Sequence, residues 1–494
     1  MKRCWIFLFL LSLAGTASSQ TIFRALVKDS ATGEVLPGVT VRAQALSESR
    51  QTNDSGLLVF PDLPNGENLF IFSYSGAATK TLSFILPDTV LHVVYLVREA
   101  AELDQVIVST RTEARIESSP MKVEVLGREE MEEENTIKPG NIASILGDVS
   151  GVQIQQSSPV SGNANVRIQG LEGRYTQILR DGMPLFEGFS GGFGILTIPP
   201  LDLRQIELIK GSASTLFGGG AIGGLVNLIS KRPTALQEAV LTLNQTTLKE
   251  SNINTYLAKR GNHFGYTFFG GLTHQGATDV NGDSLTDVSK QNTYIVHPRL
   301  FFYPSAKTTL IAGYTGTFST NTGGDVEVLK GNKSARHQFF ETNDTRRNTG
   351  ELILEQNFSR GIKAALKSSV SQFDRSIEKP THFFHGKQLN YFSEASVFLP
   401  QETWNLVAGM NLTGDAFEKQ PSDPVSLENF SNNTVGVFAQ LTNYFGETTT
   451  LETGLRVDHH QDYGTFVLPR VALFHRFSEA WGSRFGFGMG YKTP

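Results

Sequence analysis

From residue 234 onward, apolar and polar residues alternate along strand-length segments of the chain. In residues 451–458, one face of a strand would carry Leu451, Thr453, Leu455 and Val457, and the other Glu452, Gly454, Arg456 and Asp458. This period of two predicts strands rather than helices. A long series of strands with one apolar and one polar or small face is typical of an antiparallel transmembrane β-barrel. A soluble sandwich can also alternate, but it rarely needs strands this long.

The connections between these segments alternate in length. Tight turns are expected at residues 260–263, 303–306, 359–361, 399–401 and 445–448, and long polar loops at residues 276–291, 319–345, 374–387 and 415–431. Short periplasmic turns and long external loops are the usual asymmetry of such barrels. We count about thirteen strands, whereas plugged barrels have about 22 and single-chain barrels have an even number. We therefore expect residues 234–494 to be a partial barrel in a chain that lacks its C-terminal portion.

Composition excludes several other classes of protein. The 494 residues carry a net charge of −5, so nothing suggests a nucleic-acid partner. Only 39% of the residues are hydrophobic, and no stretch beyond the N-terminus reaches the roughly 18 apolar residues of a membrane helix. A membrane protein of this composition would have to cross the bilayer with strands.

Residues 1–20 are expected to be a secretory signal peptide. Lys2 and Arg3 precede an apolar core at residues 5–13, and small residues follow at 14–19. Cys4 is the one cysteine of the chain and lies in this segment. The mature protein is therefore expected to have neither a disulfide nor thiol chemistry.

Short alternating runs separated by turn residues predict a small β-sandwich over residues 21–97. The expected strands are residues 23–27, 39–43, 56–60, 68–74, 80–86 and 91–97. A linker is expected at residues 98–114.

Glycines interrupt two strand-like runs within residues 206–230. Gly218, Gly220 and Gly223 match the dinucleotide-binding pattern, but that site needs a helix after the glycines. Residues 225–229 instead alternate as a strand, which ends before Pro233. We therefore interpret the glycines as a tight turn with positive φ and close backbone packing.

Together with residues 167–184, this segment resembles the plug domain of TonB-dependent outer-membrane receptors, and the resemblance extends over residues 115–233. A strand at residues 123–126, a helix at 127–135 with a solvated glutamate face, and a second helix at 142–146 capped by Asn141 are expected. The resemblance implies a mixed α/β plug inside the barrel. Residues 21–97 resemble the carboxypeptidase regulatory-like domain that precedes many such receptors in Bacteroidetes-type bacteria, and this module carries no peptidase activity.

The resemblance also implies roles for particular residues. A TonB box is expected in the linker, where an extended peptide can add as a strand to its partner; the alternative is the last strand of the sandwich. Arg167 is the candidate that locks the plug to the barrel, although this chain has Gln169 where the family more often has arginine. The upper plug loop offers candidate ligand contacts, for which the alternative is packing against the barrel wall. The residues are Asp104, Gln105, Val106, Ile107, Val108 and Ser109 for the TonB box, and Phe186, Phe189 and Phe193 for the ligand.

One external loop has oxygen-bearing side chains at alternating positions, which could suit calcium. They are Asp279, Asn281, Asp283 and Asp287. The alternative is a polar turn, because the glycine is misplaced for a calcium loop and no glutamate closes it. No other cofactor is expected, and no pattern of catalytic residues indicates an enzyme.

The resulting expectation is a mainly β outer-membrane importer with its N-terminal domain and TonB box in the periplasm. TonB, driven by the inner-membrane ExbB/ExbD motor, would move the plug and admit a scarce solute. The expected solute is a ferric siderophore, with haem, cobalamin or a glycan as alternatives. A passive porin or an adhesin would need no energy coupling.

Overall fold

The computed structural model describes residues 21–30, 33–44, 48–74, 77–88, 90–96, 119–158, 160, 162–186, 188–189, 191–192, 194–420 and 427–493. The chain divides into two compact units, residues 1–105 and residues 106–494. The predicted signal peptide, the predicted TonB box at residues 104–109 and Phe193 lie outside the described residues.

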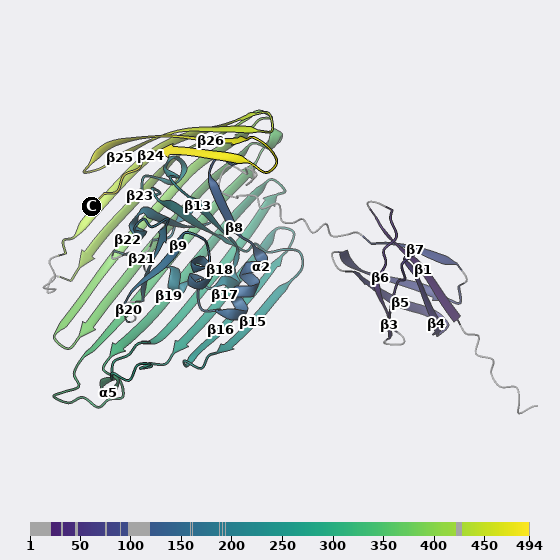
Figure 1. Ribbon diagram of the computed structural model, residues 1–494, viewed down its shortest axis with the longest axis horizontal. Coiled ribbons are helices and arrows are strands. Elements are labelled where there is room, and N and C mark those ends of the chain that lie inside the picture. The colour runs from purple at the N-terminus through teal and green to yellow at the C-terminus, as the bar shows by residue number, and fades with distance from the viewer. Residues whose placement is uncertain are drawn as a thin grey trace, which may run out of the picture. The chain divides into compact units, whose positions relative to one another are not determined.

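The first unit is a β-sandwich, as predicted (Figure 1). One sheet has the order β4-β1-β7 and the other β3-β2-β5-β6. The core between the sheets is rich in phenylalanine, and Phe23 stacks on Phe70 with 4.1 Å between ring centroids. The sequence did not predict β3, whose four residues are all exposed. The strands are β1 (Thr21–Asp29), β2 (Thr40–Ala43), β3 (Glu48–Gln51), β4 (Leu57–Leu63), β5 (Gly66–Tyr74), β6 (Ala77–Leu86) and β7 (Leu91–Leu96).

Residues 119–233, which we call the plug, form a mixed five-stranded sheet of order β12-β11-β14-β13-β8 with a separate β9–β10 hairpin. Strands β11 and β14 run parallel, and the other neighbours run antiparallel. The strands are β8 (Lys122–Leu126), β9 (Val152–Ser158), β10 (Asn163–Ile168), β11 (Thr176–Arg180), β12 (Met183–Pro184), β13 (Leu203–Lys210) and β14 (Gly224–Ser230). The helices are α2 (Arg128–Ile137), α3 (Ala143–Gly147), α4 (Ser214–Phe217), η2 (Gly173–Tyr175), η3 (Ile195–Thr197) and η4 (Pro200–Asp202).

The plug sheet is buried on both faces, so its central strands are almost continuously apolar. Ile178, Leu208 and Val226 face a core shared with α2, α3 and the β9–β10 hairpin. Leu179 and Leu225 face the other way and join a cluster that includes residues beyond 234. The plug sheet therefore packs on its own helices with one face and on the barrel strands with the other.

The glutamates of α2 are not all solvated, which corrects the prediction for this helix. Glu134 is buried and accepts a hydrogen bond from the Ser144 hydroxyl. Burial raises the pKa of this carboxyl above its usual range. Helix α3 begins one residue later than predicted, so its N-cap residue is Ile142 rather than Asn141, whose side chain accepts a hydrogen bond from the Ala143 amide at 3.0 Å. No helix in the described ranges is long and apolar enough to cross a membrane.

Thirteen strands follow in one sheet, which we call the wall, and each pairs antiparallel with the next in sequence order, confirming the predicted architecture. The wall curves around the plug (Figure 1). The strands are β15 (Glu238–Gln245), β16 (Glu250–Arg260), β17 (Phe264–Gln275), β18 (Lys290–Ser305), β19 (Thr308–Gly324), β20 (Phe340–Asn357), β21 (Lys363–Lys379), β22 (His382–Pro400), β23 (Trp404–Lys419), β24 (Phe430–Phe445), β25 (Thr449–His460), β26 (Gly464–Arg476) and β27 (Gly482–Gly488). Two short helices, α5 (Val326–Leu329) and η5 (Ser359–Gly361), lie in its connections.

Alternation along the wall has the predicted sense. Leu455 and Val457 of β25 are exposed on the outer surface, whereas Glu452, Arg456 and Asp458 are buried on the face toward the plug. The polar half of the pattern is therefore the lumen half.

The tight turns lie where the sequence predicted them, all at one end of the wall, but all four long loops are shorter than predicted, the first of them by only two residues. Residues 374–379 and 382–387 continue β21 and β22, so the loop expected at residues 374–387 is a tight connection. The strands extend beyond their apolar part with polar residues on both faces, and this polarity alone was interpreted as loop. We call the end that carries the remaining long connections, at residues 276–289, 325–339 and 420–429, the outer rim.

Candidate functional site

Six buried charged or titratable side chains meet between the plug and the wall, and we call them the charge cluster. Arg299 Nη2 lies 3.0 Å from Asp181 Oδ2 of the plug, and Arg299 Nε lies 2.9 Å from Glu351 Oε1 of the wall. His297 Nδ1 lies 2.7 Å from Asp202 Oδ2, which also pairs with Arg180. The side chain of Arg299 is only 1% exposed, so these pairs act where water screens them little. The members are Arg180, Asp181 and Asp202 from the plug and His297, Arg299 and Glu351 from the wall.

A tight turn aims Asp181 at the wall. Asp181 and Gly182 connect β11 to β12, and both have positive φ, 51° and 79°. This is the conformation that an Asp-Gly pair favours in a two-residue hairpin. The Asp181 carbonyl accepts a hydrogen bond from Lys367 Nζ of the wall at 2.7 Å. The turn is thus joined to the wall through both its backbone and its side chain.

Electrostatics keep the two plug carboxylates charged. Burial raises the pKa of the Asp202 carboxyl, but His297 and Arg180 outweigh burial and hold this pKa below its usual range. Burial also raises the pKa of the Asp181 carboxyl, but Arg299, Arg180 and the Ser230 amide together hold this pKa below its usual range. The ionised forms are therefore the stable ones in the docked plug.

Arg167 does not take the place that the sequence prediction gave it. Val166 and Ile168 face the plug core, which turns Arg167 to the other face of β10. There its guanidinium donates to the Gly170 carbonyl at 2.9 Å and to Gln155 Oε1 at 3.4 Å. In the described part of the chain, ion pairs from plug to wall are made instead by Asp181, Asp202, Lys231 and Arg232, which corrects the assignment.

A second attachment holds the glycine-rich end of the plug. Arg470 Nε of β26 donates to the Ser212 carbonyl at 3.1 Å, and Arg470 Nη1 lies 2.9 Å from Glu452 Oε2. Helix α4, which the sequence did not predict, packs on β24, β25 and β26. A Cβ on Gly454 would lie 2.7 Å from the Thr215 side chain, so the wall needs a glycine there for α4 to approach.

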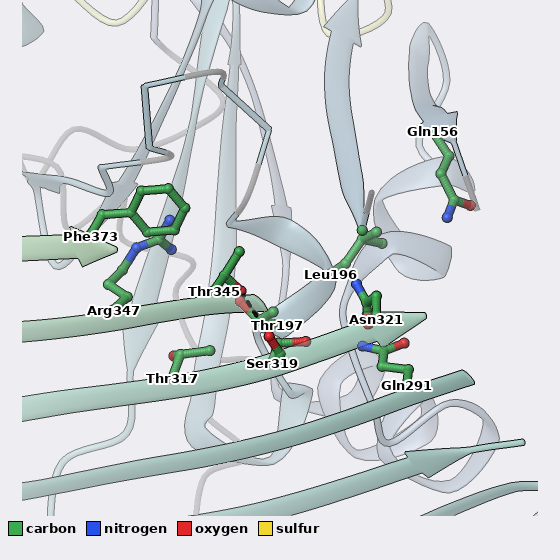
Figure 2. A pocket seen from close by; sticks show the side chains of 11 residues that line it. Gln156, Leu196, Thr197, Gln291, Thr317, Ser319, Asn321, Thr345, Arg347 and Phe373 are labelled. Carbon is green, nitrogen blue, oxygen red and sulfur yellow. Dashed lines mark hydrogen bonds between the residues drawn. The ribbon is translucent and has the colours of Figure 1, made fainter. Parts of the chain in front are cut away.

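A small polar cavity of about 50 Å³ lies between plug and wall toward the outer rim (Figure 2). Its size suits one or two water molecules rather than a solute. Figure 2 shows plug residues facing polar side chains of β18, β19 and β20 across it. Its lining includes Gln156, Leu196 and Thr197 from the plug and Gln291, Ser319, Asn321 and Arg347 from the wall.

Aromatic side chains gather at the same end of the lumen, and we call them the aromatic cluster: Phe189, Phe373, Phe384 and Phe417. The Phe189 ring centroid lies 4.7 Å from that of Phe417 and 5.7 Å from that of Phe373. The Arg347 guanidinium lies 5.0 Å from the Phe373 centroid. Phe189 is half-buried, whereas Phe186 packs against an apolar cluster that includes Phe301 and Phe392. Ligand contact by either residue stays a prediction.

The predicted calcium residues do come together in the 276–289 loop, but backbone amides occupy their oxygens. Asp287 Oδ2 accepts from the Val280 amide at 2.7 Å, and Asp279 Oδ1 accepts from the Gly282 amide at 2.7 Å. Asn281 Nδ2 lies 3.2 Å from Asp283 Oδ2. Within the described ranges, no group of three or more His, Cys, Asp or Glu side chains is arranged to hold a metal ion. Calcium binding stays a prediction.

Two known protein families together match nearly the whole of the second unit. Residues 115–225 match the TonB-dependent receptor plug domain, and residues 241–494 match the TonB-dependent receptor-like β-barrel. Both matches begin after the sandwich, whose resemblance to a regulatory-like domain therefore stays a prediction.

Individual relatives are distant. The vitamin B12 transporter BtuB of Vibrio cholerae is 20% identical over 85% of this chain and 67% of its own, and the iron-regulated outer membrane virulence protein of the same species is 22% identical over 80% and 61%. Among solved structures, the ferric enterobactin receptor PfeA of Pseudomonas aeruginosa is similar with a TM-score of 0.62 and 19% identity, over 79% of this chain and 64% of that one. The siderophore receptor PirA of Acinetobacter baumannii has a TM-score of 0.61 and 18% identity, over 79% and 63%.

The chain thus spans about two thirds of the length of the relatives it matches. The matched family consists of outer-membrane transporters and receptors rather than enzymes. A plug held inside an antiparallel wall by buried ion pairs agrees with both family matches. The chain belongs to the family of TonB-dependent receptors of the outer membrane.

Proposed function

We propose that this protein imports a scarce solute across the outer membrane with energy supplied through TonB, and that the solute is a ferric siderophore. The observation that carries the energised mechanism is the charge cluster, which fastens the plug inside the lumen. A wall charge that stays buried without its partner is costly, so a plug whose partial withdrawal would leave several such charges unpaired opens rarely without external work. A passive porin would need an open lumen instead.

TonB is proposed to grip residues 104–109. An extended segment that adds as a strand to the edge of a partner sheet is held mainly by backbone hydrogen bonds, which resist a pull along the strand. Force from the ExbB/ExbD motor would then pass through the linker to the N-terminal end of the plug. The sandwich and the TonB box would lie in the periplasm.

The aromatic cluster supports the siderophore assignment. Half-buried Phe189 offers an aromatic surface, and Arg347 places a cation beside the Phe373 ring at 5.0 Å. Aromatic faces with a neighbouring cation suit an anionic chelate that itself carries aromatic rings. The similar structures of PfeA, a ferric enterobactin receptor, and PirA, a siderophore receptor, favour the same class of solute. Cobalamin is the first alternative, because the vitamin B12 transporter BtuB is among the relatives. Haem and glycans rank below cobalamin.

Removal of residues 104–109 from the full-length gene product tests the mechanism. Cells with this deletion should bind iron-labelled chelate at the surface but lose uptake, as should wild-type cells treated with a protonophore. A deletion of residues 98–103 shortens the linker equally and should retain uptake. Energy-dependent uptake that survives the first deletion would overturn the mechanism.

The solute is tested separately by binding to the purified receptor. Several solutes are titrated into the receptor in parallel, and binding is followed by the change in tryptophan fluorescence. They are ferric catecholate and ferric hydroxamate chelates, haem, cobalamin and an oligosaccharide. The proposal expects saturable binding of a ferric chelate with the highest affinity. Preferential binding of another solute would replace the siderophore assignment and leave the TonB mechanism intact.

A further inference from the structure

A second cavity, of about 320 Å³, lies beneath α5 at the outer rim of the wall. It is lined by Lys290, Asn292, Thr320, Thr322, Lys333 and Phe340, together with two apolar residues of α5. Neither the plug nor the aromatic cluster contributes to it. It therefore forms a site separate from the proposed transport path.

Strand alternation places this cavity on the outer surface of the wall. Gln291, Ser319 and Asn321 point into the cavity between plug and wall (Figure 2). Lys290, Asn292, Thr320 and Thr322 are their immediate neighbours in β18 and β19, so they lie on the opposite face. That face is the one turned toward lipid.

The lipid-facing residues of the same strands show how deep the cavity lies relative to the hydrocarbon core of the membrane. The outward-facing residues of β18 between Tyr294 and Phe302 are apolar or aromatic, and Leu300 among them is 66% exposed. A barrel strand needs about 9–11 residues to cross the bilayer, and residues 294–302 in β18 supply that length. The next pairs beyond Tyr294 toward the outer rim are Asn292 with Thr320 and Lys290 with Thr322. The cavity therefore lies where the lipid headgroups of the outer leaflet begin.

The cavity carries uncompensated positive charge. Neither Lys290 nor Lys333 forms an ion pair with any described residue, and Lys333 Nζ lies 4.6 Å from the Phe340 ring centroid. Three nearby carboxylates already have cationic or imidazole partners. Glu327 pairs with Lys330 at 2.8 Å, Asp344 with Arg346 at 3.2 Å and Asp325 with His337 at 2.6 Å.

Hydrogen-bond donors and apolar surface complete the cavity. The side-chain oxygen of Asn292 is held by His274 Nδ1 at 2.7 Å, while Asn292 Nδ2 has no partner among the described residues. Val328 and Leu329 of α5 and the Phe340 ring supply the apolar side. Ammonium and amide donors beside an apolar wall match a phosphate group attached to acyl chains.

We propose that this cavity binds the phosphate of an anionic lipid headgroup in the outer leaflet. Lys290 and Lys333 contact the phosphate oxygens, and α5 covers the lipid backbone. The lipid then fixes the 325–339 connection against the wall. Free phosphate shares the ionic part of this chemistry but not the apolar part.

The test uses full-length receptor in neutral detergent micelles doped with phosphatidic acid, with phosphatidylcholine as the comparison lipid. Bound lipid is counted by native mass spectrometry across a titration. The variant K290A/K333A is compared with K259A/K307A, which removes two exposed lysines near the other end of the wall. Inorganic phosphate at millimolar concentration is added as a competitor in a separate arm.

Wild-type receptor should retain phosphatidic acid in preference to phosphatidylcholine. Apparent affinity should fall roughly fivefold for each lysine removed, or about 25-fold for K290A/K333A, and stay unchanged in K259A/K307A. Equal loss in both double variants, or no loss in K290A/K333A, would overturn the site. Displacement of the lipid by the millimolar inorganic phosphate of the competitor arm would overturn the assignment to a lipid.

Discussion

Asp181 of the plug and Arg299 of the wall form a buried ion pair with 3.0 Å between Oδ2 and Nη2. The two residues are 118 positions apart in the chain, and each is held by further groups of its own domain or of the wall. The Ser230 amide donates to the other Asp181 oxygen at 3.0 Å. This pair joins the plug to the wall at a place that water scarcely reaches.

Asp181→Asn should loosen the plug, because it leaves the buried Arg299 guanidinium with one carboxylate fewer. We expect a loss of about 3–5 kcal/mol in the free energy that docks the plug. The loss should appear as faster hydrogen exchange of the backbone amides in β11 and β14. Asp462→Asn changes an exposed aspartate at the outer rim in the same way and should leave exchange unaltered. Unchanged exchange in both variants would contradict the role of the pair.

Gly454→Ala should disturb the second attachment, because its new Cβ would lie 2.7 Å from Thr215 side-chain atoms. Overpacking of this kind costs about 1–3 kcal/mol of stability. Thr215→Ala removes those atoms, so the double variant should recover part of the loss in a double-mutant cycle of chemical denaturation. Gly350→Ala is the matched control, since nothing lies within 4 Å of its added Cβ. Additive effects of the two substitutions would show that α4 does not dock there.

Docking of the plug should weaken in acid. Asp181 and Asp202 have pKa values held below the usual range in the folded protein, so they bind protons less readily than in the unfolded chain. Their contribution is therefore fully present above the unfolded pKa near 3.9 and is lost as the pH falls below about 4. Thermal unfolding between pH 7 and pH 3 should show this fall, and the D181N/D202N variant should show a flatter profile. Equal slopes would contradict the assignment.

Phe189→Ala and Phe186→Ala should separate ligand contact from packing. Phe189 is half-buried in the aromatic cluster, so its loss should weaken ferric chelate binding up to about tenfold. Phe186 packs in an apolar cluster away from that surface, so its loss should lower stability with little change in affinity. Equal affinities for the Phe189→Ala variant and wild type would remove this residue from the ligand site.

Regular alternation made the wall predictable, whereas contacts between distant segments were not. Leu455 and Arg456 took the faces that a period of two requires. Strand β3 was missed because its residues are all exposed and form no pattern, and α4 because one helical turn among glycines carries no periodicity.

The charge cluster was missed because it depends on how the plug sits in the lumen. His297 and Arg299 did give a signal, since two titratable side chains at alternate positions on the lumen face of one strand need polar partners where they are buried. The Asp181-Gly182 turn gave the signal on the plug side of the cluster. Arg167 was chosen from the family pattern alone, and the β10 alternation turned it away from the wall.

A reversible cross-link between plug and wall tests the central claim most directly. A Cβ on Gly454 would lie 3.1 Å from Thr215 Cβ, so a small outward shift gives the roughly 3.5–4.5 Å that a disulfide needs, and the predicted mature chain has no other cysteine. In cells that carry full-length T215C/G454C, oxidation should abolish uptake of the iron-labelled chelate while surface binding persists, and reduction should restore uptake. In each single variant, uptake should not change on oxidation or reduction. Full uptake with the cross-link shown to be closed would contradict a mechanism in which the plug must leave the wall.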